Sequence, residues 1–333
     1  MKELFSYLQK TYPLSRPQDM LKAALQAYSG AEHAAEFLSA EGRLKEEAAQ
    51  CRETGRVENL SEKFCRYHLG EENEYRLRAV AALFSSGART PINDDFSQAL
   101  TAFQAFSFTC FSQKEKEEFL IEYERRKRPT LSHSEVYRKA YAPHYRVLPR
   151  AHARLIDVLA EIYRRSEEKE RFVIAIDGRC AAGKTTSADI LSGVLDAAVV
   201  RCDDFFIPVE ERCCPHEINL DTARFLSEIV RPLKEGGSLG GYVAYDCHAD
   251  RFFEKKLPQA RFIIVEGSYA TAPIFGRYYD YSVFVDVSEE EQKKRLLLRE
   301  GADNYELFLN KWIPLEEEYF SRYGISKRCE RTV

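Results

Sequence analysis

The stretch FVIAIDGRCAAGKTTS, residues 172–187, decides the fold of the second half of the chain. An apolar run ends at Asp177 and is followed by Gly178, four further residues and the tripeptide GKT at 183–185. A strand, a glycine-containing turn and a helix that starts at the lysine are the context in which this spacing binds a nucleoside triphosphate. We therefore predict a phosphate-binding loop between a buried strand and a helix.

The residues of this loop have expected roles toward ATP and Mg²⁺. Backbone N–H groups would surround the β-phosphate at the positive end of the following helix. Lys184 would reach the β- and γ-phosphates, the Thr185 hydroxyl would coordinate Mg²⁺, and Thr186 would contact the α-phosphate. The predicted nucleotide-binding residues are Gly178, Arg179, Cys180, Ala181, Ala182, Gly183, Lys184, Thr185 and Thr186.

Around the loop, short apolar runs alternate with helical patterns. The strand candidates after the loop are AAVVRC (197–202), RFIIVEG (261–267) and YSVFVDV (281–287). The helix candidates are KTTSADILSGVL (184–195), LDTARFLSEIVRPL (220–233) and SEEEQKKRLLLRE (288–300), the last with Ser288 as N-cap. Alternating strands and helices predict an α/β fold, a parallel sheet with helices on both faces.

Three carboxylates follow or end these strands. Asp203 and Asp204 come directly after the second strand, and Glu266 ends RFIIVEG. Ligands of open α/β sheets bind at this carboxyl edge, where a carboxylate can hold Mg²⁺ or accept a proton from an attacking hydroxyl. Phe205 and Phe206 would wall a flat or apolar acceptor. The pattern alone also fits solvated aspartates and an ion-paired glutamate.

The motifs IAIDGRCAAGKTT, RCDDFFIP, NLDTARF, YDCHADRF, IIVEGSYA and YDYSVFVDV, in this order, resemble the uridine kinase and phosphoribulokinase group of P-loop kinases. That group includes pantothenate and nicotinamide riboside kinases. The resemblance covers about residues 170–325. It implies a three-layer P-loop NTPase fold like that of nucleoside kinases. It also implies transfer of the γ-phosphoryl group of MgATP to a hydroxyl, foremost the 5′-OH of a nucleoside such as uridine or cytidine.

The resemblance also implies roles for single residues. Asp203 matches the catalytic base, Asp221 the acid that holds the sugar hydroxyls, and Tyr245 an aromatic of the nucleoside pocket. Arg295 and Arg299, four residues apart on one helix face, match arginines that clamp the transferred group. The implied sets are catalytic Lys184, Asp203, Arg295 and Arg299, acceptor-binding Asp204, Phe206, Asp221, Tyr245 and Arg251, and metal-binding Thr185, Asp203 and Glu266.

The chain departs from the uridine kinase pattern after Tyr245. Asp250 stands where a histidine is expected, and Arg251 comes one residue early. Nicotinamide riboside and pantothenate therefore remain open as acceptors. So do two other functions: an ATP-binding regulatory module without small-molecule kinase activity, and a phosphotransferase directed at protein or RNA.

Residues 1–150 differ in character from the rest. They contain five of the sixteen glycines, and apolar residues recur in them at helical spacing. We predict a mainly helical domain of unknown role over 1–150 and a P-loop kinase domain over 151–333, with N-caps at Ser112 and at Asp94 or Asp95. The stretch 131–148, LSHSEVYRKAYAPHYRVL, predicts either a patch that binds anions or nucleic acid, or a buried junction against the kinase domain.

The totals exclude some classes of protein. A net charge of −4, with 31% charged residues, does not favour nucleic acid as the main partner. No apolar run approaches the roughly 20 residues that span a bilayer, so we expect a soluble, cytoplasmic protein with no membrane partner. Nine cysteines predict reduced thiols, and the absence of a CxxC spacing argues against a zinc site formed by Cys213, Cys214, His216, Cys247 and His248. Oligomeric state is left open.

Overall fold

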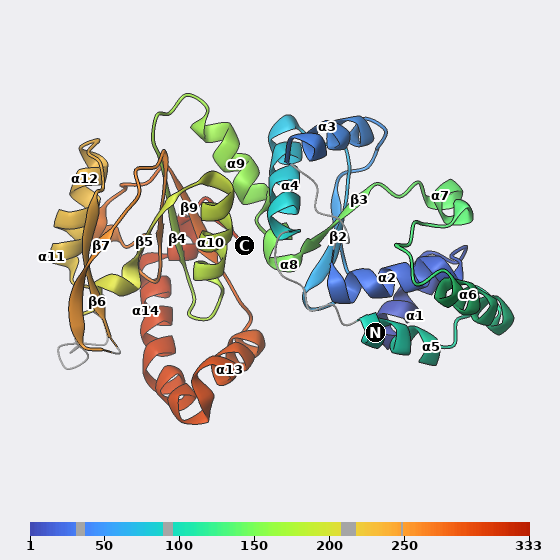
Figure 1. Cartoon of the computed structure of the whole chain (residues 1–333). Helices are drawn as coiled ribbons and strands as arrows, with labels where there is room; N and C mark the ends of the chain where they lie inside the picture. The colour runs from blue at the N-terminus through green and yellow to red at the C-terminus, as the bar shows by residue number, and fades with distance from the viewer. Residues whose placement is uncertain (31–36, 89–95, 208–217, 248) are drawn as a thin grey trace. The chain divides into compact units, whose positions relative to one another are not determined.

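The computed structural model describes residues 1–30, 37–88, 96–207, 218–247 and 249–333. The chain divides into two compact units, Met1–Ala160 and Glu161–Val333 (Figure 1). The dividing point lies inside helix α9, Ile156–Ser166, on the C-terminal side of the boundary expected near residue 150. Each unit is described here by itself.

The first unit is mainly helical and also contains a small antiparallel sheet. Its strands, in the order β1-β2-β3, are Arg56–Asn59, Phe64–His68 and Tyr145–Pro149. Its helices before α9 are α1 Lys2–Thr11, α2 Pro17–Ser29, α3 Phe37–Ala48, α4 Glu74–Gly87, α5 Phe96–Ala105, α6 Gln113–Arg125, α7 Glu135–Tyr141 and α8 Arg150–Ala153. The sequence predicted the long helices, and it did not predict the sheet.

The helix ends follow from local side chains. The Ser112 hydroxyl accepts a hydrogen bond from the Glu115 amide, and the Glu115 carboxylate accepts one from the Ser112 amide, so α6 starts with a capping box as predicted. The predicted caps Asp94 and Asp95 lie outside the described residues. Helix α2 is buried on nearly all sides, and Met20, Leu21 and Ala24 lie in the core of this unit.

A buried ionic network joins the sheet to α2. The Arg66 side chain on β2 is 1% exposed, and its Nη1 lies 3.2 Å from Glu58 Oε2 on β1. Arg66 also donates from Nε and Nη2 to Gln26 Oε1 of α2, at 3.1 and 2.9 Å. Glu58 accepts a further hydrogen bond from the Tyr12 hydroxyl at 2.9 Å, and His68 Nε2 lies 3.2 Å from it. The charges are therefore paired out of contact with water, as burial requires.

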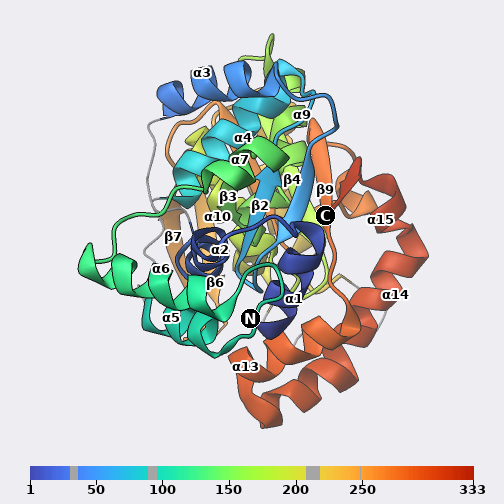
Figure 2. The same cartoon turned by 90° about the vertical axis from the view of Figure 1, so that its right-hand side faces the viewer.

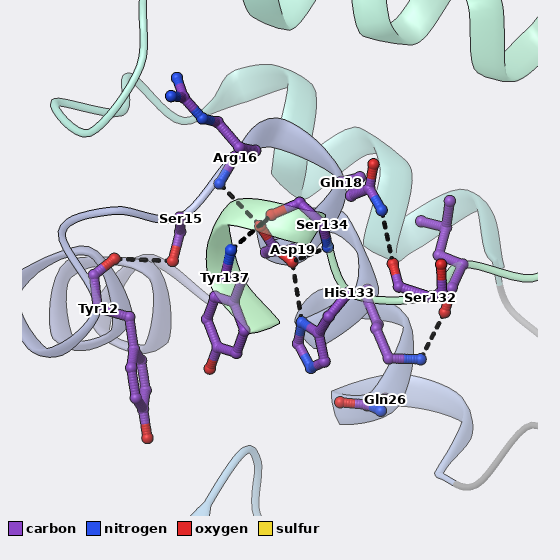
Figure 3. A network of polar contacts seen from close by, with 12 residues as sticks. Tyr12, Ser15, Arg16, Gln18, Asp19, Gln26, Ser132, His133, Ser134 and Tyr137 are labelled. Atoms are coloured by element: carbon purple, nitrogen blue, oxygen red, sulfur yellow. Dashed lines mark hydrogen bonds and ion pairs between the residues drawn. The ribbon is translucent and has the colours of Figure 1, made fainter. Parts of the chain in front are cut away.

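A second carboxylate, Asp19 of α2, fixes two helix starts (Figure 3). It accepts hydrogen bonds from the Arg16 amide, at 2.9 Å, and from the Ser134 amide and hydroxyl, at 2.8 and 2.6 Å. Ser134 in turn caps α7 through the Tyr137 amide. His133 Nδ1 lies 2.9 Å from the same carboxylate. Asp19 thereby holds the segment of His133 and Ser134 against α2.

Several side chains of residues 131–148 lie in the core of the first unit. Tyr137 stacks on His133 and packs against Tyr12 in that core. Tyr145 covers the Arg66 guanidinium at 4.6 Å. Arg146, predicted to bind phosphate, donates two hydrogen bonds to the Glu47 carboxylate, whereas Arg138 and Lys139 are exposed. The binding patch and the junction with the kinase domain both stay predictions.

The Glu58 network predicts acid sensitivity of the first unit. Burial alone would raise the pKa of Glu58, but the hydrogen bond with His68 and the charge of Arg66 lower it from 4.5 to about 2. A lowered carboxyl pKa gives stability that is present above about pH 4.5 and is lost as the pH falls toward 2. At about pH 3.5 we expect a loss on the order of 1 kcal/mol for Glu58.

Urea unfolding at about pH 6 and about pH 3.5 measures this effect. Far-UV circular dichroism follows the whole chain, and the single tryptophan, Trp312, reports on the second unit only. Glu58→Gln should flatten the pH dependence of the dichroism transition and leave that of Trp312 fluorescence unchanged. An unaltered pH dependence in this variant would show that Glu58 does not carry the effect.

The second unit contains a five-stranded parallel sheet in the order β10-β9-β4-β8-β5 (Figure 1). These strands are β4 Phe172–Gly178, β5 Ala198–Arg201, β8 Phe262–Glu266, β9 Tyr281–Val285 and β10 Arg331–Thr332. Every residue of β4, β8 and β9 is buried, as expected for strands covered on both faces. This arrangement, with a phosphate-binding loop after β4, confirms the predicted P-loop NTPase fold.

The helices of this unit largely follow the predicted ranges. They are α10 Lys184–Leu195, η1 Cys202–Phe205, the continuous run of α11 Thr222–Phe225, η3 Leu226–Val230 and α12 Arg231–Lys234, then η4 Pro273–Phe275, α13 Glu289–Leu307, η5 Phe308–Trp312, α14 Ile313–Tyr323 and α15 Ile325–Arg328. Ser288 caps α13 through the Glu291 amide, as predicted. Figure 2 shows α13, α14 and α15 following one another along one flank of this unit.

One hairpin of this unit was not predicted. Strands β6, Gly241–Asp246, and β7, Arg251–Lys256, pair antiparallel and form a separate two-stranded sheet. β6 buries Tyr242, Ala244 and Tyr245, whereas β7 is almost entirely exposed. In neither unit does a described helix have the length and apolarity needed to cross a bilayer. The cysteines within the described ranges are free thiols.

Candidate functional site

The loop after β4 has the backbone shape that a phosphate cradle requires. Gly178 has a φ of 141°, and a Cβ atom there would lie 2.1 Å from the carbonyl oxygen of Val285 on β9. Gly183 has a φ of 101° and directly precedes α10, which starts at Lys184 as predicted. Only glycine adopts these conformations without strain, so both positions depend on the missing side chain. The amides at the start of α10 are thereby free to face an anion.

Two cations contact this loop. Lys184 Nζ donates to the carbonyl oxygens of Gly178 and Arg179, at 2.7 and 2.9 Å. Arg295 of α13 also contacts the loop and donates from Nη1 to the carbonyl oxygens of Ala181 and Ala182, at 3.0 and 3.2 Å. The predicted catalytic arginine is therefore beside the predicted phosphate cradle. Arg299, one turn later, is ion-paired with Glu300 and also acts electrostatically on Asp203.

The carboxyl ends of β4, β5 and β8 bring the remaining charged groups together. Glu266 ends β8 with 3% exposure, and its Oε1 accepts a hydrogen bond from the Thr185 hydroxyl at 3.2 Å. Desolvation raises the pKa of Glu266, the charge of Asp203 raises it further, and Arg201 and Lys184 act against this. β4, β8 and β5 are parallel neighbours, so Lys184 after the loop of β4, Glu266 at the end of β8 and Asp203 after β5 all lie at one end of the sheet.

Asp203, the predicted base, combines solvent exposure with a raised pKa. Its side chain is exposed to solvent in η1, directly after β5. The surrounding protein nevertheless desolvates the carboxylate and raises its pKa, against the lowering effect of Lys184, and Asp204 adds a further raising effect. A carboxylate that a substrate can reach and whose pKa is above the usual range is suited to accepting a proton.

Asp204, predicted to contact the acceptor, is held by the β6–β7 hairpin. Its Oδ2 accepts hydrogen bonds from the Tyr242 hydroxyl and from Lys255 Nζ, the latter at 2.7 Å. These contacts come from both strands of the hairpin. One carboxylate oxygen of Asp204 thus ties η1, with Asp203, to β6 and β7.

Arg224 of α11 makes a second link between the same elements. Its guanidinium lies between the rings of Phe205 and Phe252, 5.2 and 5.3 Å from their centroids. It also donates to the carbonyl oxygen of Val243 on β6 and forms an ion pair with Glu228 at 3.0 Å. The predicted base, the start of α11 and the hairpin therefore form one packed group.

The other predicted acceptor residues lie on this group and have local partners. Asp221 caps α11 by accepting from the Arg224 amide at 3.0 Å. The Tyr245 hydroxyl donates to Asp250 Oδ1 at 2.6 Å, so Asp250, at the predicted histidine position, orients the tyrosine. Phe206 is half-buried, and Arg251 is exposed at the start of β7. His248, Cys213, Cys214 and His216 lie outside the described residues.

The sequence analysis did not identify the residues that hold β4 and the loop in place through hydrogen bonds and ion pairs. Asp177, the fully buried end of β4, accepts hydrogen bonds from the Thr271 hydroxyl at 2.7 Å and the Tyr319 hydroxyl at 2.9 Å, besides three amides. Glu316 of α14 accepts from the Cys180 amide at 2.8 Å, and Glu317 pairs with Arg179. The signal for Asp177 was a carboxylate inside an otherwise apolar strand.

The residues present fit a magnesium nucleotide. Hydroxyl and carboxylate oxygens are the ligands that Mg²⁺ takes in proteins, and at nucleotide sites one or two carboxylates join phosphate oxygens and water. Thr185 and Glu266 converge beside the cradle, with Asp203 close enough to shift the pKa of Glu266. Among the described residues no group of three or more histidine, cysteine or acidic side chains converges.

Comparisons with known proteins add the following findings. No protein-family model matches the chain, and no curated protein matches it. Among solved structures, the chain is similar to a possible uridine kinase from Bacillus stearothermophilus, with 20% identity, a TM-score of 0.43, and coverage of 54% of this chain and 97% of that one. It is also similar to a candidate fructose transport system kinase from Silicibacter sp. TM1040, with 21% identity, a TM-score of 0.41, and coverage of 52% and 95%.

Proposed function

We propose that the protein is an ATP-dependent phosphotransferase that transfers the γ-phosphoryl group of MgATP to a hydroxyl of a small molecule, in the first place the 5′-OH of a uridine- or cytidine-like nucleoside. The observation that carries this proposal is the position of Asp203. It offers a solvent-accessible carboxylate with a raised pKa beside Lys184 and the loop. A nucleotide switch needs no such base, so the arrangement favours a kinase over a regulatory module.

The residues divide the reaction between them. The loop amides and Lys184 hold the β- and γ-phosphates, and Arg295, which contacts the same loop, adds a second positive charge. Asp203 accepts the proton of the acceptor hydroxyl. The hydroxyl oxygen of the acceptor forms a bond to the γ-phosphorus while the bond between the γ-phosphorus and the β,γ-bridging oxygen breaks, and ADP leaves. Thr185, Glu266 and Asp203 would hold Mg²⁺, which neutralises phosphate charge. Orientation and electrostatics supply most of the rate enhancement.

ADP release by the purified chain with MgATP tests the proposal. The acceptor panel contains ribonucleosides, nicotinamide riboside and pantothenate, and Lys184→Ala serves as the inactive reference. We expect one acceptor to raise the rate well above the basal rate in the wild-type protein and not in Lys184→Ala. Tight ATP binding without stimulation by any acceptor would instead support the regulatory module.

A further inference from the structure

Arg201 occupies an unusual position at the end of β5. Its Nη1 lies 2.7 Å from Glu266 Oε1, and its Nη2 lies 2.9 Å from Asp189 Oδ1 on α10. The two carboxylates differ in exposure, since the Glu266 side chain is 4% exposed and that of Asp189 is 57% exposed. Arg201 Nη2 therefore pairs with the exposed carboxylate of Asp189, and Nη1 pairs with the buried carboxylate of Glu266.

Arg201 contacts the same Glu266 oxygen as Thr185, the other predicted metal ligand beside the loop. Glu266 Oε1 accepts hydrogen bonds from both Arg201 and the Thr185 hydroxyl. A buried carboxylate needs hydrogen-bond donors or a counter-charge, and a guanidinium or a divalent cation can supply that charge. Both cannot share one oxygen, because two cations a few ångströms apart repel each other strongly in a desolvated site.

We propose that Arg201 competes with the divalent cation for Glu266, so that the metal–nucleotide complex enters only when the Arg201–Glu266 pair opens. The proposal rests on the proposed function for the identity of the metal site. Its consequence is that metal without nucleotide binds weakly, because it must displace Arg201 with few ligands of its own. Metal that arrives with a nucleotide brings phosphate oxygens as further ligands, so the two bind together.

Binding of Mn²⁺, measured by electron paramagnetic resonance in the absence of nucleotide, tests this competition. Arg201→Met removes the charge and keeps most of the side-chain length. We expect it to bind Mn²⁺ about fivefold to tenfold more tightly than the wild-type protein, the factor that corresponds to loss of one partly buried competing ion pair. Arg277→Met is the matched control, because Arg277 pairs with Glu330 in the same unit, and its affinity should equal that of the wild type.

Two results would overturn the proposal. One is an Mn²⁺ affinity of Arg201→Met equal to or weaker than that of the wild-type protein. The other is an increase in Mn²⁺ affinity that persists in the double variant Arg201→Met with Glu266→Gln, since the metal would then bind at a site without Glu266. These measurements need no phosphoryl transfer. A panel without an active acceptor would refute the proposed kinase and leave the competition between Arg201 and Mn²⁺ as an independent result.

A second measurement uses the wild-type protein, in case Arg201→Met fails to fold. The Arg201 Nε–Hε resonance can be assigned by comparing NMR spectra of the wild-type and Arg201→Lys proteins. Addition of Mg²⁺ with ADP should shift this resonance much more than ADP with a chelator. Equal shifts under both conditions would show that the metal does not displace Arg201.

Discussion

Replacing Asp203 by asparagine is expected to lower acceptor-dependent ADP release by a factor of roughly one hundred or more, the scale of losing a general base. Asparagine keeps the size of the side chain and removes its ability to accept the hydroxyl proton. The desolvated carboxylate next to Asp204 and Glu266 is also relieved of repulsion, so folding should not suffer. Nucleotide affinity without magnesium should change little, which separates a loss of chemistry from a loss of binding.

Asp196→Asn is the matched control for this experiment. Asp196 is an exposed aspartate at the opposite end of α10, with a φ of 52° that asparagine tolerates well. Its replacement should leave the rate of ADP release within about twofold, since surface changes away from a site have small effects. Near-normal turnover of Asp203→Asn would remove Asp203 from the proposed role.

Replacing Arg66 by methionine should destabilise the first unit by about 3 kcal/mol or more. The substitution leaves Glu58 buried without its guanidinium partner and removes both hydrogen bonds to Gln26. Methionine fills much of the same volume, so the loss reflects charge and hydrogen bonding rather than a cavity. The midpoint of urea unfolding, followed by far-UV circular dichroism, should fall, while the Trp312 transition of the second unit stays in place.

Arg146→Met, on the neighbouring strand, is the comparison for Arg66. Arg146 is paired with Glu47, but both side chains reach solvent, so its loss should cost less than about 1 kcal/mol. The double variant Glu58→Gln with Arg66→Met should recover part of the stability, because no unpaired charge then remains buried. Equal costs for Arg66→Met and Arg146→Met would contradict the role assigned to the buried pair.

The sequence predicted the second unit well because its signals are local. The apolar runs that became β4, β8 and β9 are buried on both faces, and α10 starts at the lysine of the loop motif. Ser288 stands where a capping serine should stand. The hairpin was missed because β7 is exposed on both faces and shows no alternation.

The sheet of the first unit could not be predicted in the same way. The strand FCRYH, residues 64–68, contains an arginine and a histidine, which suggest an exposed segment. Arg66 is nevertheless among the most buried side chains of the chain, because Glu58 and Gln26 approach it from β1 and α2. Such compensation depends on residues far apart in the sequence, and no local pattern records it.

The sequence predicted where the charged residues of the candidate site lie in the fold, but it did not predict which side chains pair with them. Strand ends placed Asp203 and Glu266 at one edge of the sheet, and the loop motif placed Lys184 and Thr185 there. The partners of these groups come from distant segments: Arg201 binds Glu266, and Lys255 binds Asp204. In the sequence, Arg201 and Lys255 look like ordinary exposed cations. Only the folded chain brings them into contact with Glu266 and Asp204.

The stacking of Arg224 on Phe205 and Phe252 limits how the segment around Asp203 could diverge in evolution. It fixes the hairpin to the segment that carries Asp203 through both strands, because Phe252 lies on β7 and Val243 lies on β6. Replacing one of the three side chains alone would remove a contact on which the other two depend. Among related sequences, Arg224 and its two phenylalanines should therefore change only together.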